Sequence, residues 1–144
     1  MADAPARRGS TRTKARKRAL DILFEADLRE QDVLVRLAEH TDQAEPPVRP
    51  FTTELVTGVV GQQAELDAAI AAELSSGWSL QRMPRVDRNL ARLALFELRQ
   101  AETEPSVVIA EYVGLAADLS TDESPAFLNG LLAALVQRKV DAAG

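Results

Sequence analysis

The fold class is decided by the stretch Val86-Asp-Arg-Asn-Leu-Ala-Arg-Leu-Ala-Leu-Phe-Glu-Leu98. Its apolar residues recur every three or four positions, which places Val86, Leu90, Leu93 and Ala94 on one face of a helix. We expect this helix over about residues 86–101. No stretch of the chain shows the strict alternation of a strand, so the sequence predicts an all-α fold.

Working outward from this stretch, we expect further helices over about residues 11–29, 31–40, 51–61, 62–75, 105–119 and 124–139. Prolines mark the loop at 41–50, and small residues break the pattern at 75–77. Ser124 is the expected N-cap of the last helix, with Pro125 in its first turn. The breaks near 77–85 are a candidate boundary between two helical halves.

Length and composition limit the class of protein. A chain of 144 residues with 46% apolar residues suits a single domain, which we place at 11–144, after a disordered basic arm at 1–10. The absence of cysteine excludes disulfides and thiolate metal sites. No apolar run approaches the roughly 18 residues of a membrane span. We therefore expect a soluble, cytoplasmic protein with no membrane partner.

The charges are segregated along the chain. Residues 1–18 hold seven basic residues and one aspartate, a formal charge of +6, so that a net charge of -5 leaves -11 for the remainder. A basic N-terminal segment on an acidic body is typical of polyanion binding. A solvated tail without a ligand is the alternative that charge alone leaves open.

Phe24 is the second indication of a nucleic-acid ligand. On a helical wheel it points away from the apolar stripe of Ala19, Ile22 and Ala26, and it shares its side of the helix with Lys17. Bases stack on aromatic rings while ammonium groups hold phosphates. The alternative is that another helix covers Phe24.

The helix expected at 86–101 carries two further features: an arginine stripe and a carboxylate on its apolar face. Arg85, Arg88, Arg92 and Arg99 form a stripe that could contact phosphates, pair with carboxylates or be solvated. Glu97 projects into the apolar stripe, where we expect an arginine or backbone amides to satisfy it.

Motifs for catalysis and cofactors are missing. The chain has one histidine, His40, and it lacks glycine-rich phosphate loops and a nucleophile elbow. Trp78, in the break between helices, is expected to anchor its loop. We expect neither an enzyme nor a cofactor or metal site.

Four segments resemble the NusB family of antitermination factors. They are Thr13-Lys-Ala-Arg-Lys-Arg-Ala-Leu-Asp-Ile-Leu-Phe-Glu-Ala-Asp27, the stretch Val86–Leu98, Pro105–Leu119, and Ser120-Thr-Asp-Glu-Ser-Pro-Ala-Phe-Leu-Asn-Gly130. The resemblance covers about residues 11–137. It implies an all-helical fold of about seven helices in two small packed bundles.

The resemblance also implies a function. Members bind the single-stranded boxA element of nascent ribosomal RNA together with NusE, a ribosomal small-subunit protein, within the RNA polymerase elongation complex and its other Nus factors. By resemblance, the RNA-binding residues are Arg12, Lys14, Arg16, Lys17, Phe24 and Phe127, with a weaker match at Gln81 and Arg82. Asp87 and Arg88 are the corresponding candidates for the partner face.

Other functions stay open at this stage. An interaction module of the same fold, or an orphan rRNA-recognition domain without boxA binding, is the alternative to an antitermination factor. The sequence also leaves open whether the protein without its partners is a monomer or a homodimer.

Overall fold

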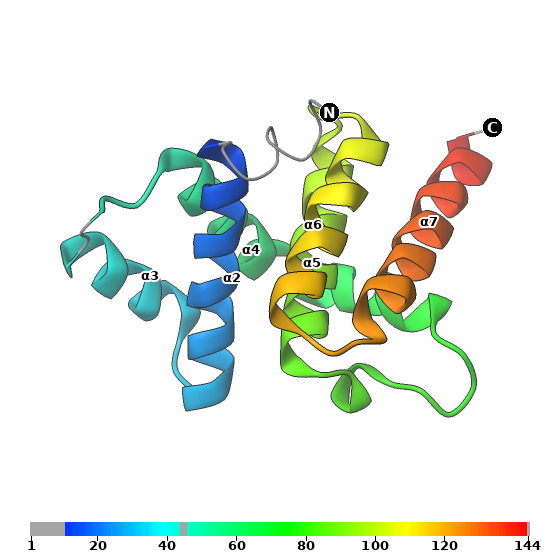
Figure 1. Ribbon diagram of the computed structural model, residues 1–144, viewed down its shortest axis with the longest axis horizontal. Coiled ribbons are helices and arrows are strands. Elements are labelled where there is room, and N and C mark those ends of the chain that lie inside the picture. The colour runs from blue at the N-terminus through cyan, green and yellow to red at the C-terminus, as the bar shows by residue number, and fades with distance from the viewer. Residues whose placement is uncertain (1–10, 44–45, 144) are drawn as a thin grey trace. The chain divides into compact units, whose positions relative to one another are not determined.

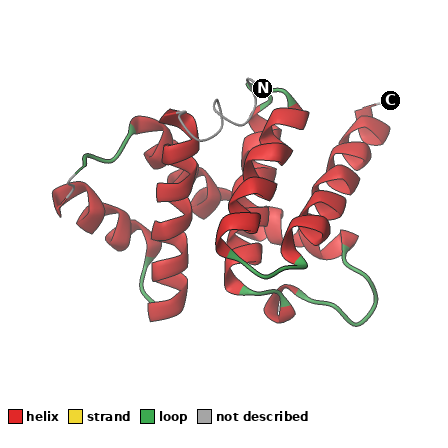
Figure 2. Cartoon of the chain, viewed as in Figure 1, coloured by secondary structure: helices red, strands yellow, loops and turns green. Residues whose placement is uncertain are grey.

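The protein was analysed as a computed structural model, which describes residues 11–43 and 46–143 and, at 140–143, the backbone alone. The predicted basic arm at 1–10 lies outside the described residues. Within the described ranges the chain forms six α-helices and one 3₁₀ turn and no strand (Figure 2). The all-α prediction is therefore confirmed. No helix among these residues has the length and apolar character needed to cross a membrane.

The chain divides into two compact units, residues 1–61 and 62–144. The first unit contains α2 (Thr11–Arg29), α3 (Val33–Gln43) and the first part of α4 (Pro50–Glu73), and α2 and α3 pack against each other (Figure 1). Its core includes the α2 stripe that the sequence predicts, with Ala19 and Ile22 fully buried, and Leu55 and Val59 of α4. The predicted boundary at 77–85 is wrong, because the division falls within α4.

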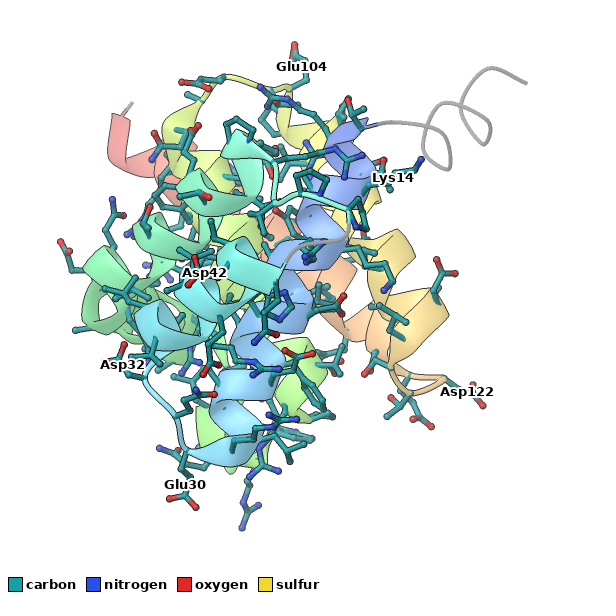
Figure 3. All side chains as sticks on the ribbon, turned by 90° about the vertical axis from the view of Figure 1, so that its left-hand side faces the viewer. Lys14, Glu30, Asp32, Asp42, Glu104 and Asp122 are labelled. Carbon is teal, nitrogen blue, oxygen red and sulfur yellow. The ribbon has the colours of Figure 1, made fainter. Side chains whose placement is uncertain are left out.

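Two local features define the turn between α2 and α3: a left-handed residue and a side-chain cap. Glu30 adopts a left-handed conformation with φ of 54°, and the following Gln31 N–H donates to the Ala26 carbonyl at 2.9 Å. Asp32 then caps α3, because its Oδ1 accepts from the backbone N–H groups of Leu34 and Val35 at 2.9 and 3.2 Å. Glu30 and Asp32 are labelled beside this turn in Figure 3.

Helix α4 corrects the prediction of two helices at 51–61 and 62–75. It runs unbroken over 24 residues, Pro50–Glu73. Pro50 opens it at a position where the missing N–H has no helical partner to lose. Gly58 and Gly61 do not end it, since a glycine inside a helix costs only about 1 kcal/mol relative to alanine.

The second unit contains the rest of α4, the 3₁₀ turn η1 (Leu80–Arg82), and helices α5 (Arg85–Gln100), α6 (Pro105–Leu119) and α7 (Ser124–Ala143). Helix α5 packs against both α6 and α7, and these two pack against each other. Leu90 and Leu93 of α5 and Leu128 and Leu132 of α7 are fully buried. The apolar stripe of α5 that the sequence predicts is thus the centre of this unit.

Glu97 is buried in that centre, with 3% of its surface exposed. The hydroxyl of the fully buried Tyr112 donates to its Oε1 at 2.8 Å. A tyrosine on α6 is therefore a partner that the sequence analysis, which expected an arginine or backbone amides, did not name. A carboxylate so enclosed has no access to a substrate.

Gly61 gives a direct test of the continuity of α4. A Cβ at this position meets nothing within 4 Å, and its backbone is helical. We expect Gly61→Ala to stabilise the protein by about 0.5–1 kcal/mol in urea-induced unfolding, because alanine loses less conformational entropy. Gly77→Ala is the matched control, since Gly77 has a φ of 89° and the same change there should destabilise. A destabilised Gly61→Ala variant would contradict an unbroken α4.

Candidate nucleic-acid interface

Helix α2 presents a basic surface at its N-terminal half. Arg12, Lys14 and Lys17 are exposed, and Figure 3 shows the Lys14 side chain projecting from the helix. Lys17 reaches Asp21 one turn later, with Nζ 3.4 Å from Oδ2, an exposed pair of small energetic value. Three cations within two turns are therefore accessible to a polyanion.

Arg16, the fourth predicted contact on this helix, has a different place. Only 3% of its surface is exposed, and its guanidinium carbon lies 5.5 Å from the ring centroid of Phe51 on α4. Arg12 covers the same ring at 4.0 Å. Near this contact, the Thr52 hydroxyl donates to the Ala15 carbonyl at 2.9 Å and joins α4 to α2. Arg16 therefore serves the packing of α2 on α4, and its burial does not favour RNA contact.

The sequence left open whether Phe24 is exposed to a ligand or covered by another helix, and the structure gives an intermediate result. It is half-buried, neither in the core with Ile22 nor fully exposed. On the same side of the wheel, Leu20 is 2% exposed and Leu28 is 52% exposed. The outer side of α2 is thus covered near its middle and open near its end, and Phe24 keeps part of its ring accessible.

A network of polar side chains joins α2 to α3. Glu25 Oε1 accepts from Arg36 Nε at 2.9 Å and lies 2.8 Å from His40 Nε2. Arg18 Nε donates to His40 Nδ1 at 3.0 Å, which requires that nitrogen to be unprotonated. His40 of α3 therefore links to both Arg18 and Glu25 of α2.

Burial raises the pKa of Glu25, but the hydrogen bonds from His40 and Arg36 outweigh it and hold the pKa below its ordinary value. Asp21 shows the opposite balance, because burial raises its pKa more than Lys17 lowers it. Two carboxylates on one helix thus respond to their surroundings in opposite directions.

The second unit carries a separate aromatic surface. The Phe127 ring, at the start of α7, is half-buried, and its centroid lies 6.1 Å from that of Trp78. The two rings border a pocket of about 420 Å³ that Arg82 also lines. Gln81 and Arg82 are exposed in the turn η1. The structure therefore brings two of the predicted RNA-binding residues, Phe127 and Arg82, to one pocket, whereas Gln81 is not among the residues that line it.

Trp78 is the residue that the sequence analysis missed at this surface. It is 51% exposed and does not serve as the buried loop anchor that its position predicts. Its position three residues before Gln81 in the sequence was the feature that could have identified it as part of this surface.

Asp87, a predicted partner contact, is only 2% exposed. Its carboxylate accepts hydrogen bonds from the hydroxyls of Ser120 and Ser124, the latter at 2.8 Å. Ser124 is consequently not the N-cap of α7, because the Phe127 N–H donates to the Glu123 carbonyl and makes Glu123 the capping position. Asp87 thus fastens the loop before α7 and positions Phe127.

The arginine stripe of α5 divides into structural and exposed members. Arg92 forms a bidentate pair with Asp67 of α4, at 2.7 and 3.0 Å, which is the carboxylate pairing that the sequence left open. Arg88, the other predicted partner contact, is half-buried and donates to the Leu80 carbonyl at 3.0 Å. Arg85 and Arg99 are exposed.

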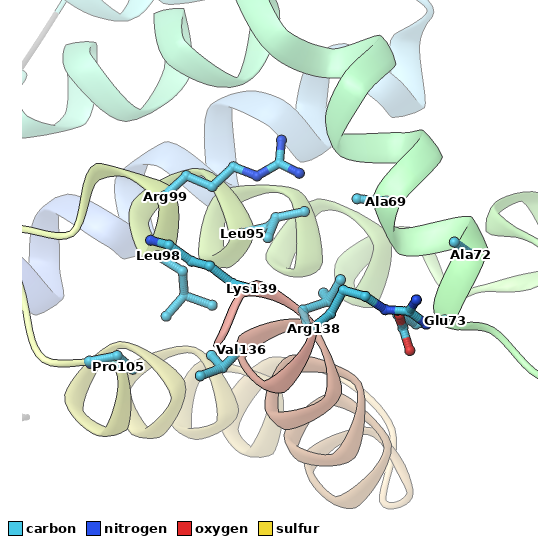
Figure 4. A pocket seen from close by; sticks show the side chains of 11 residues that line it. Ala69, Ala72, Glu73, Leu95, Leu98, Arg99, Pro105, Val136, Arg138 and Lys139 are labelled. Atoms are coloured by element: carbon cyan, nitrogen blue, oxygen red, sulfur yellow. The ribbon is translucent and has the colours of Figure 1, made fainter. Parts of the chain in front are cut away.

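Another pocket, of about 430 Å³, lies among α4, α5, α6 and α7 of the second unit (Figure 4). Its lining includes Leu95, Leu98 and Val136, with Arg99, Arg138 and Lys139 around them, and Arg138 pairs with Glu73 at 2.9 Å. The described residues contain no group of three or more side chains suited to hold a metal ion.

An all-helical chain with an exposed basic helix face and half-exposed aromatic rings has the make-up of a nucleic-acid-binding adaptor. The model of the NusB family matches residues 13–137. The chain therefore belongs to the NusB family.

Relatives and solved structures agree with this assignment. The transcription antitermination protein NusB of Acidothermus cellulolyticus is 56% identical over 125 residues, which is 86% of each chain. The structure of T. maritima NusB superposes with a TM-score of 0.80 at 27% identity, covering 89% of this chain and 92% of that one. A structure of the antitermination factors NusB and NusE in complex with dsRNA gives a TM-score of 0.78 at 27% identity, covering 88% and 96%.

Asp87 allows a structural and a partner-binding role to be separated. We expect Asp87→Ala to lower the free energy of unfolding by about 1.5–3 kcal/mol, because two serine hydroxyls lose a buried charged acceptor. Urea-induced unfolding measures this difference. Asp122→Ala is the control, since Asp122 is exposed in the same loop and should change stability little. A stable Asp87→Ala variant that fails to bind NusE would instead make Asp87 a partner contact.

Glu25 makes part of the stability depend on pH. Its folded-state pKa is lowered, so its contribution is fully present above the ordinary value of 4.5 and is lost as the pH falls below it. We expect Glu25→Gln to be less stable than the parent at neutral pH, with the difference shrinking below about pH 4.5. Asp21→Asn should show no such acid-side loss, because the pKa of Asp21 is raised. A difference for Glu25→Gln that is constant with pH would contradict the network.

Proposed function

We propose that this protein is a transcription antitermination factor that binds the single-stranded boxA element of nascent ribosomal RNA together with NusE. In this role it joins the RNA polymerase elongation complex with other Nus factors and promotes processive rRNA transcription in the cytoplasm. Membership of the NusB family supports this proposal. The single observation that carries it is the exposed basic surface of α2 on a chain whose remainder is acidic.

The charge distribution explains why α2 is the part that meets RNA. Residues after 18 carry a formal charge of -11 and repel a phosphate backbone, whereas Arg12, Lys14 and Lys17 attract it. Phe24, half-buried on the same helix, offers part of a ring for stacking. We leave Arg16 out of the contact set, because its guanidinium is buried against Phe51.

The acidic remainder also suggests why a partner is needed. A basic protein bound beside the RNA would offset the repulsion and extend the phosphate-binding surface. Ribosomal proteins are commonly basic, and a solved relative was captured with NusE and RNA together. We therefore propose that NusE raises the affinity for RNA, and that RNA raises the affinity for NusE by the same factor.

No enzymatic role is proposed. The two buried carboxylates of α5 are engaged inside the unit, Glu97 by Tyr112 and Asp87 by Ser120 and Ser124. A helical interaction module without RNA binding is the competing function. Binding of boxA RNA by the isolated protein would distinguish the proposed function from this one.

Salt dependence tests the basic surface. We expect the triple variant Arg12→Ala, Lys14→Ala, Lys17→Ala to bind boxA RNA more weakly and to reduce the log–log salt slope by about 0.7 for each lost phosphate contact. The matched control is Arg99→Ala, Arg138→Ala, Lys139→Ala, which removes the same charge from exposed residues of the second unit. Equal slopes for the two triple variants would mean that only overall charge matters. An unchanged slope for the α2 variant would exclude this surface as the RNA contact.

The coupling to NusE is tested by titrating boxA RNA into the protein alone and into its complex with NusE at one salt concentration. We expect tighter binding to the complex by roughly 5- to 150-fold, the range of typical coupling energies. The reverse titration, of NusE with and without RNA, must give the same factor. Equal RNA affinities in the two states would show that the two ligands bind independently.

A further inference from the structure

The segment between α4 and α5 is held firmly although it is a loop. The Trp78 N–H donates to the Ser75 carbonyl at 2.9 Å and closes a turn in which Gly77 has a φ of 89°. Arg82 Nη1 donates to the Gly77 carbonyl at 2.9 Å and fixes the same turn from the other side. A left-handed position of this kind favours glycine, so the local sequence is suited to the turn.

The end of this segment is anchored as well. Met83 is 3% exposed, and Arg88 donates to the Leu80 carbonyl at 3.0 Å. The backbone is held at both ends of the segment, so Trp78 is exposed in an ordered loop. The largest side chain of the segment is 51% exposed, while the smaller Met83 is buried in the same loop. Since burying an aromatic side chain is strongly favourable, an ordered but open indole leaves apolar surface that a ligand would stabilise by covering.

The surroundings of the indole describe a ligand. The planes of Trp78 and Phe127 are inclined by 33° with centroids 6.1 Å apart, so the two rings form adjoining parts of one aromatic wall. Met83 and Pro84 add apolar lining to a pocket of about 420 Å³, and Arg82, Asp87 and Glu123 are its charged members, of which Asp87 is engaged by the hydroxyls of Ser120 and Ser124. A flat, largely apolar ring with polar edges fits such a wall, and Arg82 keeps further N–H donors for an anion beside it.

We propose that Trp78 stacks on an unpaired base of the bound RNA, next to Phe127, with Arg82 contacting a neighbouring phosphate. This inference rests on the proposed function and adds to it Trp78, a base-stacking residue beside Phe127 and Arg82, for which the family resemblance already implies RNA contact. Trp78 and Arg82 bind the RNA directly, whereas Gly77 is a positioning residue. Glu123 repels phosphate, so the backbone of the strand lies on the Arg82 side of the pocket.

The chemistry of stacking determines which RNA is bound. A base in a duplex already has both faces covered by its neighbours, whereas a base in a single strand can turn one face to the indole. Stacking on an aromatic ring tolerates any base, because each has a π-face. The Trp78 site therefore favours single-stranded over double-stranded RNA and contributes little to the choice of sequence.

Trp78 is the only tryptophan of the chain, so its fluorescence reports on this site alone. We would titrate the full-length protein with single-stranded boxA RNA and with the same RNA annealed to its complement, while measuring binding independently by gel shift. Stacking on a base should quench and shift the indole emission with the single strand. The duplex should leave the emission close to that of the protein alone.

Variants test the contribution to affinity. Trp78→Ala should weaken binding of single-stranded boxA RNA by roughly 5- to 150-fold, while Trp78→Phe keeps a ring and should retain most of the affinity. Val107→Ala is the matched control, because Val107 is an exposed apolar residue of α6 at 47%. Gly77→Ala keeps the indole but strains the turn, and it should weaken RNA binding without removing a contacting group. Far-ultraviolet circular dichroism and urea-induced unfolding show whether each variant folds.

The outcomes separate this inference from the proposed function. If the parent protein binds no boxA RNA, the proposed function fails and the inference fails with it. If the parent binds RNA but its emission is unchanged and folded Trp78→Ala keeps full affinity, the proposed function stands and the stacking inference is overturned. A Trp78→Ala variant that loses affinity for NusE and not for RNA would also overturn it, by making this wall a protein contact.

Discussion

Helix α5 is buried along most of its length, and its polar side chains must therefore find partners inside the second unit. Each of these partners connects a different part of that unit. Asp87 binds the serine hydroxyls before α7, Arg92 pairs with Asp67 on α4, and Glu97 accepts from Tyr112 on α6. An unpaired buried carboxylate would cost several kcal/mol, so these contacts fix where the neighbouring segments lie. The aromatic wall depends on this arrangement, because the loop that Asp87 holds leads directly into Phe127.

The basic residues of α2 show how one charged stretch serves two purposes. Lys14 and Lys17 remain in solvent, whereas Arg16 is buried with its guanidinium near the ring of Phe51. An arginine can be buried against an aromatic ring because its charge is delocalised and weakly hydrated, whereas an ammonium group is strongly hydrated. Between positions 14 and 17 of α2, the arginine is buried in the unit and the two lysines lie at its surface.

Much of the fold and part of the site followed from the sequence. The apolar period predicted α2, α5 and α6 closely, because each has a continuous stripe and clear ends. It failed at α4, where it predicted two helices in place of one, and at Ser124, whose hydroxyl was taken for a cap but binds Asp87. Among the predicted site residues, Arg12, Lys14, Lys17 and Arg82 lie at the surface, and Asp87 and Arg16 do not. Composition and spacing could not separate these groups, since all six are charged residues and neither property shows what packs over a side chain.

The sequence by itself determined the helical class, the basic start on an acidic chain and the family, because periodicity, charge and motif order are properties of the chain alone. Only the tertiary structure decided which charged residues are accessible and which are enclosed. Burial depends on what the neighbouring helices place over a residue, and a helical wheel cannot show this. Trp78 illustrates the point, because its exposure follows from hydrogen bonds at Ser75 and Gly77 and the burial of Met83. The turn itself is local, but which of the two apolar side chains, Trp78 or Met83, is enclosed depends on what the rest of the unit places over the loop.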